Sequence, residues 1–145
     1  MSGRIGEAWT RKGKGMIGYV VLGSNDLPRA RDFYDNLMPT IGAGRIMEFG
    51  DNFTMYGTGM GKPALAVAKP YDGNSATAGN GNMAAIALDT RDKVDALYAK
   101  AIELGGSCEG PPGLRGDEGD QAFYGAYFRD LDGNKLAAFC IGPAD

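Results

Sequence analysis

The sequence predicts an α+β fold of two βαβββ modules. Three observations lead to this prediction: an internal repeat, the same strand-then-helix order in both halves, and a β-hairpin that closes the chain. A repeat of this size indicates two similar modules that bury their sheets together, and not two independent domains. We therefore expect one domain over residues 16–145, with module one at 16–70 and module two at 82–141.

Module one opens with GYVVLGS at 18–24, which is rich in the β-branched residues that favour strands. Asn25 or Asp26 then caps a helix, and Pro28 is tolerated in its first turn. Apolar residues follow at spacings of three and four, so one face of the helix packs on a sheet. These residues are Leu27, Ala30, Phe33, Tyr34 and Leu37. Three short strands are expected next, at 45–49, 52–57 and 64–69.

Module two repeats this pattern at an offset of 64 residues, which lays Tyr19 on Met83 and Tyr34 on Tyr98. A second helix is expected, with Asp89 or Thr90 as its cap and the Gly105-Gly106 pair as its stop. Its apolar stripe has the same spacing as the first. The stripe consists of Val94, Leu97, Tyr98, Ala101 and Leu104.

The closing hairpin is predicted from two apolar runs, at 123–128 and 136–141, that flank the turn segment RDLDGN at 129–134. Glycine and asparagine in this turn tolerate the positive φ that tight turns need. Before the hairpin we expect a short strand at 107–110 and a long polar loop, PPGLRGDEGDQ, at 111–121. Loops of this length are often functional, so this loop is a candidate lid.

Composition excludes several classes of function. The chain of 145 residues has 15 basic and 18 acidic residues, which gives no electrostatic footprint for nucleic acid. No apolar run is long enough to cross a membrane. The only cysteines, Cys108 and Cys140, are too few for a disulfide scaffold, which favours a reducing, cytoplasmic location, and their roles stay unassigned. There is no histidine, the commonest ligand of catalytic transition metals and the usual general base.

Residues 1–15 carry four basic side chains against one acid and have no apolar core of their own. They lack the apolar region of a secretory signal. We expect a flexible arm, an over-long start or a leftover of an expression vector, with Met16 opening the domain. Trp9, the only tryptophan, is then left to dock on the domain or on a partner subunit.

The chain resembles the vicinal oxygen chelate superfamily, which groups glyoxalase I, extradiol dioxygenases, fosfomycin-resistance enzymes and bleomycin-binding proteins. Its closing segment is similar to the strand, R-D-P-D-G-N turn and last strand of the glyoxalase-like branch, with Leu131 in place of proline. NDLPRARDFYDNL at 25–37 looks like the first helix of that branch, and GNGNMAAIALDTRDKVDALYAKAIELGG at 79–106 resembles the start of its second module. The resemblance covers residues 16–141. It implies paired modules around a central groove and assembly as a homodimer.

The resemblance also implies a divalent metal in the groove, held by the first strand of each module and the last strand of the chain. It assigns the three ligand positions to Tyr19, Met83 and Ala137. A thioether is soft, alanine has no donor atom, and a phenol titrates too high to be a ready ligand. We therefore expect no metal and no cofactor. The acidic residues of the 111–121 loop are a weaker alternative for binding calcium or magnesium through oxygen atoms.

Without histidine, polar chemistry would rest on tyrosine, acidic, lysine or cysteine side chains. Tyr19 either donates a hydrogen bond into the groove or is a core tyrosine with its hydroxyl at the surface, and Met83 either lines an apolar pocket or fills the core. Cys140, three residues beyond Ala137, should face the opposite side of its strand. No catalytic residue is assigned. The candidate ligand-binding residues are Tyr19, Glu48, Tyr56, Met83, Arg115 and Tyr124.

Two hypotheses of function remain. The first is a metal-free protein of the glyoxalase/bleomycin-resistance kind that binds a small, partly aromatic molecule in the groove, because tyrosine and phenylalanine walls with a few polar groups suit such a ligand. The alternative is an enzyme, a glyoxalase-like lyase or a dioxygenase with a non-standard site. A third possibility is an interaction module in which the groove has lost its ligand.

Overall fold

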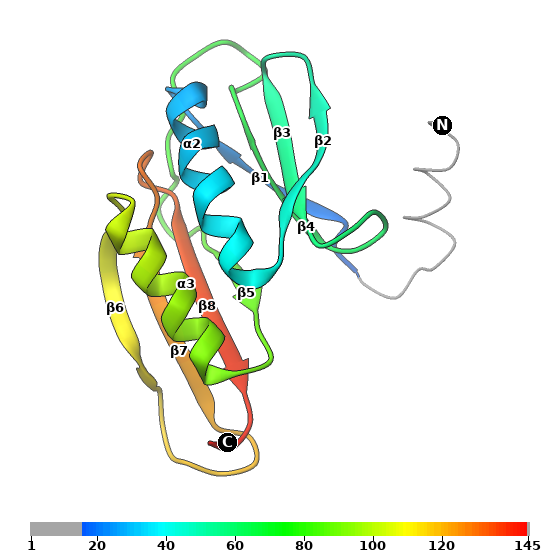
Figure 1. Cartoon of the computed structure of the whole chain (residues 1–145). Coiled ribbons are helices and arrows are strands. Elements are labelled where there is room, and N and C mark those ends of the chain that lie inside the picture. Colours follow the sequence, from blue (N-terminus) through cyan, green and yellow to red (C-terminus); the bar gives the residue numbers. More distant parts are fainter. Residues whose placement is uncertain (1–15, 145) are drawn as a thin grey trace. The chain divides into compact units, whose positions relative to one another are not determined.

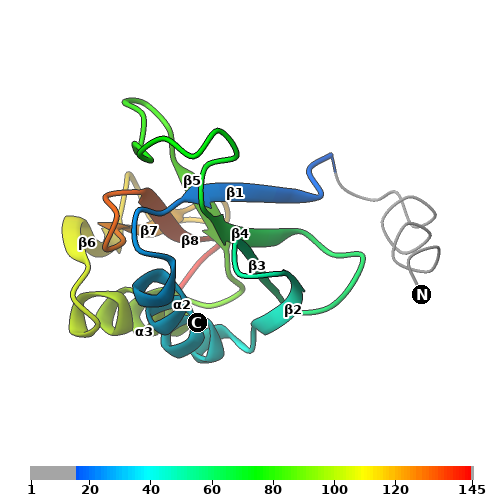
Figure 2. The same cartoon turned by 90° about the horizontal axis from the view of Figure 1, so that it is seen from above.

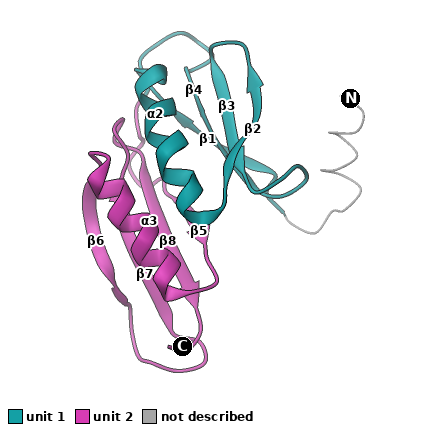
Figure 3. Ribbon diagram, in the orientation of Figure 1, with its two compact units in different colours: residues 1–76 teal, residues 77–145 magenta. Residues whose placement is uncertain are grey.

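The computed structural model describes residues 16–144. The chain divides into two compact units, residues 1–76 and residues 77–145 (Figure 3). The boundary falls in the stretch between the two modules expected from the sequence. The expected N-terminal arm at 1–15, with Trp9, lies outside the described residues.

Unit 1 is a four-stranded sheet with one α-helix on one of its faces (Figure 1, Figure 2). The strands lie in the order β1-β4-β3-β2, with β1 and β4 parallel and the other neighbours antiparallel. The sequence prediction of one strand, one helix and three strands is confirmed for this unit. Its elements are β1 (Tyr19–Gly23), α2 (Leu27–Leu37), the 3₁₀-helix η1 (Met38–Ile41), β2 (Gly44–Phe49), β3 (Phe53–Gly57) and β4 (Ala64–Ala68).

Unit 2 has the same topology, with the strand order β5-β8-β7-β6 and a parallel β5–β8 pair. It is therefore a second βαβββ module, and the predicted α+β fold class is confirmed. Its elements are β5 (Ala84–Ala87), α3 (Arg91–Glu103), β6 (Ser107–Leu114), β7 (Phe123–Arg129) and β8 (Lys135–Ile141).

The two helices begin at equivalent positions of the repeat, since their caps, Asp26 and Thr90, are 90 − 26 = 64 residues apart. The Asp26 carboxylate accepts a hydrogen bond from the Arg29 amide at 3.1 Å, and the Thr90 hydroxyl accepts one from the Lys93 amide at 3.2 Å. Each cap satisfies an amide that the first helical turn leaves without a partner. The structure thus selects one of the two caps that the sequence allowed at each helix.

The core of each unit lies between its helix and its sheet. In unit 1 the five apolar helix positions predicted from the sequence are all buried, and the Tyr34 ring lies 5.8 Å from the ring of Tyr56 on β3. In unit 2 Val94, Leu97 and Ala101 of α3 are fully buried, as are Ala126 and Phe128 of β7. The periodicity of the sequence therefore identified the inner face of α2, whereas Tyr98 and Leu104 of the second expected stripe are only partly buried.

The closing hairpin forms as predicted, and Asp130 fixes its turn. One carboxylate oxygen of Asp130 accepts hydrogen bonds from the amides of Asp132 and Asn134, both at 2.9 Å. The other oxygen accepts one from the Asn134 side chain at 3.0 Å. Gly133 has a φ of 86°, which is the left-handed conformation expected of it.

The segment before the hairpin differs from the sequence prediction. A strand at 107–110 and a loop at 111–121 were expected, but β6 continues to Leu114, so the loop is shorter. Prolines at 111 and 112 suggested a loop because proline has no amide to give to a sheet. They are accommodated because β6 is an edge strand whose register with β7 shifts twice, between Cys108 and Gly110 and between Gly110 and Gly113.

Within residues 16–144, no helix has the length and apolar character needed to cross a bilayer.

Gly106, shortly after α3, provides a test of how the end of this helix packs on β7. A Cβ at this position would lie 2.7 Å from the Arg129 carbonyl oxygen and 2.8 Å from that of Ala101. Because both neighbours are backbone atoms, we expect Gly106→Ala to lower the free energy of unfolding by about 2 kcal/mol or more. Gly44→Ala on β2 is the matched control, since nothing lies within 4 Å of its Cβ. Urea denaturation compares the two, and equal stabilities would contradict the packing described for unit 2.

Candidate functional site

Each sheet has one face that packs on the helix of its own unit and one face that does not, here called the helix-free face. Side chains alternate between faces along a strand, and residues paired across strands share a face. Tyr56 pairs with Leu65 and hydrogen-bonds to α2, so this side of the unit 1 sheet is the helix side. Tyr19 pairs with Ala64, one residue away from Leu65, and therefore belongs to the helix-free face.

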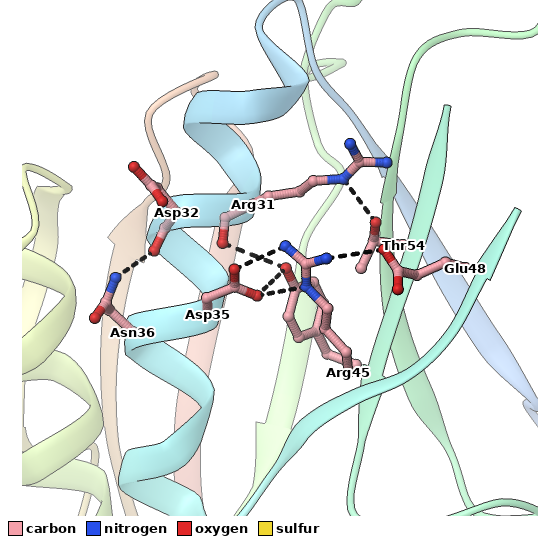
Figure 4. Close-up of polar contacts among 8 residues, drawn as sticks. Arg31, Asp32, Asp35, Asn36, Arg45, Glu48 and Thr54 are labelled. Atoms are coloured by element: carbon pink, nitrogen blue, oxygen red, sulfur yellow. Dashed lines mark hydrogen bonds and ion pairs between the residues drawn. The ribbon is translucent and has the colours of Figure 1, made fainter. Parts of the chain in front are cut away.

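A polar cluster on the helix side of unit 1 joins α2 to β2 and β3 (Figure 4). The Arg45 guanidinium donates two hydrogen bonds of 2.8 Å to the Asp35 carboxylate. It donates a third, also of 2.8 Å, to Glu48. The Tyr56 hydroxyl donates to Asp35 at 2.9 Å. Two of the predicted ligand-binding residues, Glu48 and Tyr56, thus meet around Arg45.

The electrostatics of this cluster favour the charged carboxylate and the neutral phenol. The hydrogen bonds from Arg45 hold the pKa of Asp35 below its ordinary value, although partial burial opposes them. Burial raises the pKa of Tyr56, and the bond to Asp35 raises it further. Tyr56 is 1% exposed, so its hydroxyl acts as a hydrogen-bond donor between β3 and α2 and does not serve as a base.

A cleft of about 530 Å³ lies at the N-terminal end of α2, within unit 1. Arg31 reaches it from the helix, and its Nε donates a hydrogen bond of 2.8 Å to the Thr54 hydroxyl. One terminal nitrogen of Arg31 is buried without a hydrogen-bond partner among the described residues. The cleft collects charges of both signs. Its lining consists of Asn25, Asp26, Leu27, Pro28, Arg31, Asp51, Asn52 and Lys69.

The helix-free face of unit 1 carries exposed aromatic side chains. Tyr19 on β1 is 52% exposed and meets Phe53 on β3 edge to face, with the ring centroids 6.2 Å apart. Phe53 also contacts Phe49, whose ring centroid is 5.6 Å away. Tyr19 is thus about half exposed, beside an aromatic patch and not within the core.

On the helix side of unit 2, Tyr124 links β7 to α3, and Arg91 links α3 to the loop between β6 and β7. The Tyr124 hydroxyl donates to Asp95 at 2.7 Å, and this bond raises the pKa of Tyr124 to about 12. Arg91 lies over the Tyr124 ring at 5.1 Å and binds Glu118 of the loop through both of its terminal nitrogens. The loop expected to act as a lid is therefore attached to α3 by an ion pair.

The helix-free face of unit 2 carries Ala137, which pairs with Ala85 and with Tyr127. Met83 lies directly before β5 and is 48% exposed. The Arg115 guanidinium lies over the Tyr127 ring, with Cζ 5.4 Å from the centroid. Cys140 pairs with Tyr124 on the opposite face, which confirms its predicted orientation.

The side chains present do not fit a divalent metal at the three positions that the family resemblance assigns. Ala137 is 1% exposed and offers no donor atom, and its neighbours Ala85 and Ala138 offer none either. Met83 presents a thioether, which is a poor ligand for zinc, iron or manganese. Residues 16–144 contain no group of three or more Cys, Asp or Glu side chains placed to hold a metal ion.

Sequence reasoning missed Asp35, Arg45, Tyr127 and Lys135. Asp35 and Arg45 were not singled out, since nothing local shows that helix and strand bring them together. Phe123, Gly125 and Tyr127 follow one another at two-residue spacing along β7, and this alternation was a usable signal for one shared face. Lys135 could be placed on that face only from the register of the hairpin, in which it pairs with Arg129.

The Asp35–Arg45 pair gives the stability of unit 1 a pH dependence. Because the pKa of Asp35 is lower in the folded state, its charge stabilises the fold above the ordinary aspartate pKa, and this contribution is lost as the pH falls below about 4. We expect Asp35→Asn to lower the free energy of unfolding by about 1 kcal/mol at pH 7, since the pair is partly exposed. The difference from the unsubstituted chain should shrink toward pH 3.

Asp32→Asn is the control, because it removes the same charge from an exposed position one turn earlier on α2. Urea denaturation at pH 7 and pH 3 measures all three proteins. A deficit of Asp35→Asn that does not change with pH would show that the ion pair is not its cause.

Comparison with known proteins agrees with this architecture. The model of the Glyoxalase/Bleomycin resistance protein/Dioxygenase superfamily matches residues 16–138. A glyoxalase/bleomycin resistance protein from Albidiferax ferrireducens T118 is 35% identical, with a TM-score of 0.76 over 87% of this chain and 99% of that one. No curated protein gives a significant match.

More distant structures share the fold alone. A hypothetical protein, SA1046 from S. aureus, is 24% identical, with a TM-score of 0.64 over 90% of this chain and 97% of that one. A lactoylglutathione lyase from Agrobacterium tumefaciens is 17% identical, with a TM-score of 0.59 over 87% of this chain and 93% of that one. The family match spans both βαβββ units, so the chain belongs to the glyoxalase/bleomycin resistance protein/dioxygenase superfamily.

Proposed function

We propose that this chain binds a small, partly aromatic molecule and that it does so without a divalent metal. The observation that carries the proposal is the chemistry of the helix-free faces. The positions that would hold a metal carry a phenol, a thioether and a methyl group, and aromatic residues lie beside Tyr19 and Ala137. Binding there would rest on ring contacts and a few hydrogen bonds.

Each unit contributes aromatic surface of its own. In unit 1 Tyr19 and Phe49 are more than half exposed, and Phe53 lies between them in ring contact with both. In unit 2 the rings of Phe123 and Phe139 stack 5.3 Å apart. Exposed aromatic patches of this kind are typical of ligand or partner sites, because their burial on binding releases ordered water.

Three of the predicted ligand-binding residues already have partners on the helix sides of the sheets. Tyr56 and Tyr124 donate their hydroxyl hydrogens to Asp35 and Asp95, and Glu48 is paired with Arg45. These side chains hold helices to sheets, so a ligand contact by Glu48, Tyr56 or Tyr124 stays a prediction. Tyr19 and Arg115, on helix-free faces, are the better placed of the predicted residues.

Metal content tests the metal-free half of the proposal. We expect elemental analysis of protein purified without an affinity tag to find far less than one Ni, Zn, Fe or Mn per chain. EDTA and added divalent ions should leave the melting temperature unchanged, since residues 16–144 offer them no group of three or more Cys, Asp or Glu side chains. A stoichiometric metal whose removal lowers the melting temperature would instead favour the alternative function, a metal-dependent lyase or dioxygenase.

Tyr19→Phe tests the binding half. A thermal-shift screen of small phenyl and phenolic compounds against their cyclohexyl analogues should identify ligands that raise the melting temperature by mass action. Because Tyr19 is 52% exposed, its loss of a hydroxyl should leave the melting temperature of the free protein unchanged but reduce the shift produced by phenolic ligands. Tyr71→Phe, at a fully exposed residue, is the control. A screen in which aromatic and cyclohexyl compounds behave alike would count against the proposal.

A further inference from the structure

Two cations flank a single tyrosine ring on the helix-free face of unit 2, beside a pair of stacked phenylalanines. We infer that this surface binds the carboxylate of an aryl-alkyl acid, with Arg115 and Lys135 holding the anion and Phe123 and Phe139 receiving the aryl group. The inference rests on the proposed function, which it deepens by naming the class of ligand.

Arg115 is held in place by backbone and ring contacts. Its two terminal nitrogens donate to the carbonyl oxygens of Gly113 at 3.0 Å and Pro111 at 2.7 Å. Its Cζ lies 5.4 Å from the centre of the Tyr127 ring. Of the five N–H groups of a guanidinium, 5 − 2 = 3 remain, and none of them bonds to an acceptor among residues 16–144. Arg115 is thus oriented before any anion arrives, which reduces the entropy lost on binding.

Two glycines of β6 make room for the guanidinium. A Cβ on Gly110 would lie 3.1 Å from one terminal nitrogen of Arg115, and a Cβ on Gly113 would lie 3.3 Å from the other. Larger residues at either position would crowd the guanidinium. The irregular register of β6, which the prolines and glycines produce, therefore creates the space in which Arg115 folds back over Tyr127.

Lys135 reaches the same ring from β8, with Nζ 5.6 Å from the Tyr127 centroid. A third cation nearby, Arg129, pairs with Glu109. This pairing is the main cause that lowers the pKa of Glu109, and the charge of Lys135 is the smallest cause. Neither Arg115 nor Lys135 forms an ion pair with a carboxylate among residues 16–144. Two cations without an acidic partner are the charge complement of an anionic ligand.

The aromatic platform lies one step along the same strand. Phe123 folds its ring over Gly125, where a Cβ would approach the ring to 2.8 Å, and stacks on Phe139 with an angle of 5° between the planes. Gly125 and Tyr127 are two residues apart on one face, a spacing of roughly 7 Å. A phenyl ring joined to a carboxylate by two methylene groups spans about that distance, so both groups can bind at once.

Titration of the full-length, ¹⁵N-labelled chain with 3-phenylpropanoate, followed by NMR, tests this inference. Its neutral amide, 3-phenylpropanamide, is the matched probe. We expect the acid to bind about tenfold more tightly than the amide, as one charge-assisted contact implies. The largest shifts should fall on the amides of Gly110, Gly113 and Gly125.

Arg115→Gln and Lys135→Gln should each weaken binding of the acid about tenfold and leave binding of the amide unchanged. Lys100→Gln removes the same charge from α3, on the other side of the sheet, and should change neither. Thermal unfolding of each variant confirms that it is folded.

Three results would overturn the inference. Equal affinity for acid and amide would refute the anion site and leave the aromatic binding proposed above intact. Binding of the acid that is unaffected by Arg115→Gln, or shifts confined to other parts of the chain, would place the anion elsewhere. Absence of binding by either probe at millimolar concentration would refute this ligand class, and the thermal-shift screen with Tyr19→Phe would then decide the broader proposal separately.

Discussion

Each unit provides one helix for four strands, and this ratio determines how its residues can be used. A single helix covers only one face of a sheet, so the apolar residues that drive folding gather there, as Phe33 and Tyr34 do in unit 1 and Leu97 and Phe128 in unit 2. The other face has no helix of its own unit. Aromatic side chains on that face, such as Tyr19 and Tyr127, are not needed to hold a helix and are available for another molecule.

Polar residues also differ between the helix side and the helix-free face. On the helix side, Asp35, Arg45 and Tyr56 satisfy one another, and so do Asp95 and Tyr124. A group whose hydrogen bonds are made within the fold gains little from a ligand and loses stability when it is disturbed. On the helix-free face of unit 2, Arg115 is fixed only by carbonyl oxygens and a ring, so its charge is not neutralised. The face of the sheet thus separates structural polar residues from those suited to recognition.

The sequence predicted the fold well, because its signals are local and occur twice. The helical stripes, the caps and the Asp130 turn depend on residues a few positions apart, and the 64-residue repeat linked the halves. The site was harder to predict, because register decides which strand residues share a face. Glu48 and Tyr56 were grouped with Tyr19, but pairing with Thr54 and Leu65 places them on the other side of the sheet. The predicted strand at 107–110 ended before the observed end of β6. An edge strand with bulges tolerates prolines that a regular strand would not.

The strand order also has a consequence for how the protein forms during synthesis. Within residues 16–144, β1 pairs only with β4, the last strand of its unit, and β5 pairs only with β8. The first strand of each unit therefore leaves the ribosome without a hydrogen-bonding partner. It remains so until the last strand of the unit follows, 64 − 23 = 41 residues later in unit 1 and 135 − 87 = 48 residues later in unit 2. Until then its apolar residues, among them Val20 and Val21, are accessible to chaperones and to other nascent chains. Slow translation within either unit would lengthen this exposure, whereas a pause once β4 has left the exit tunnel would let the first sheet close before β5 emerges.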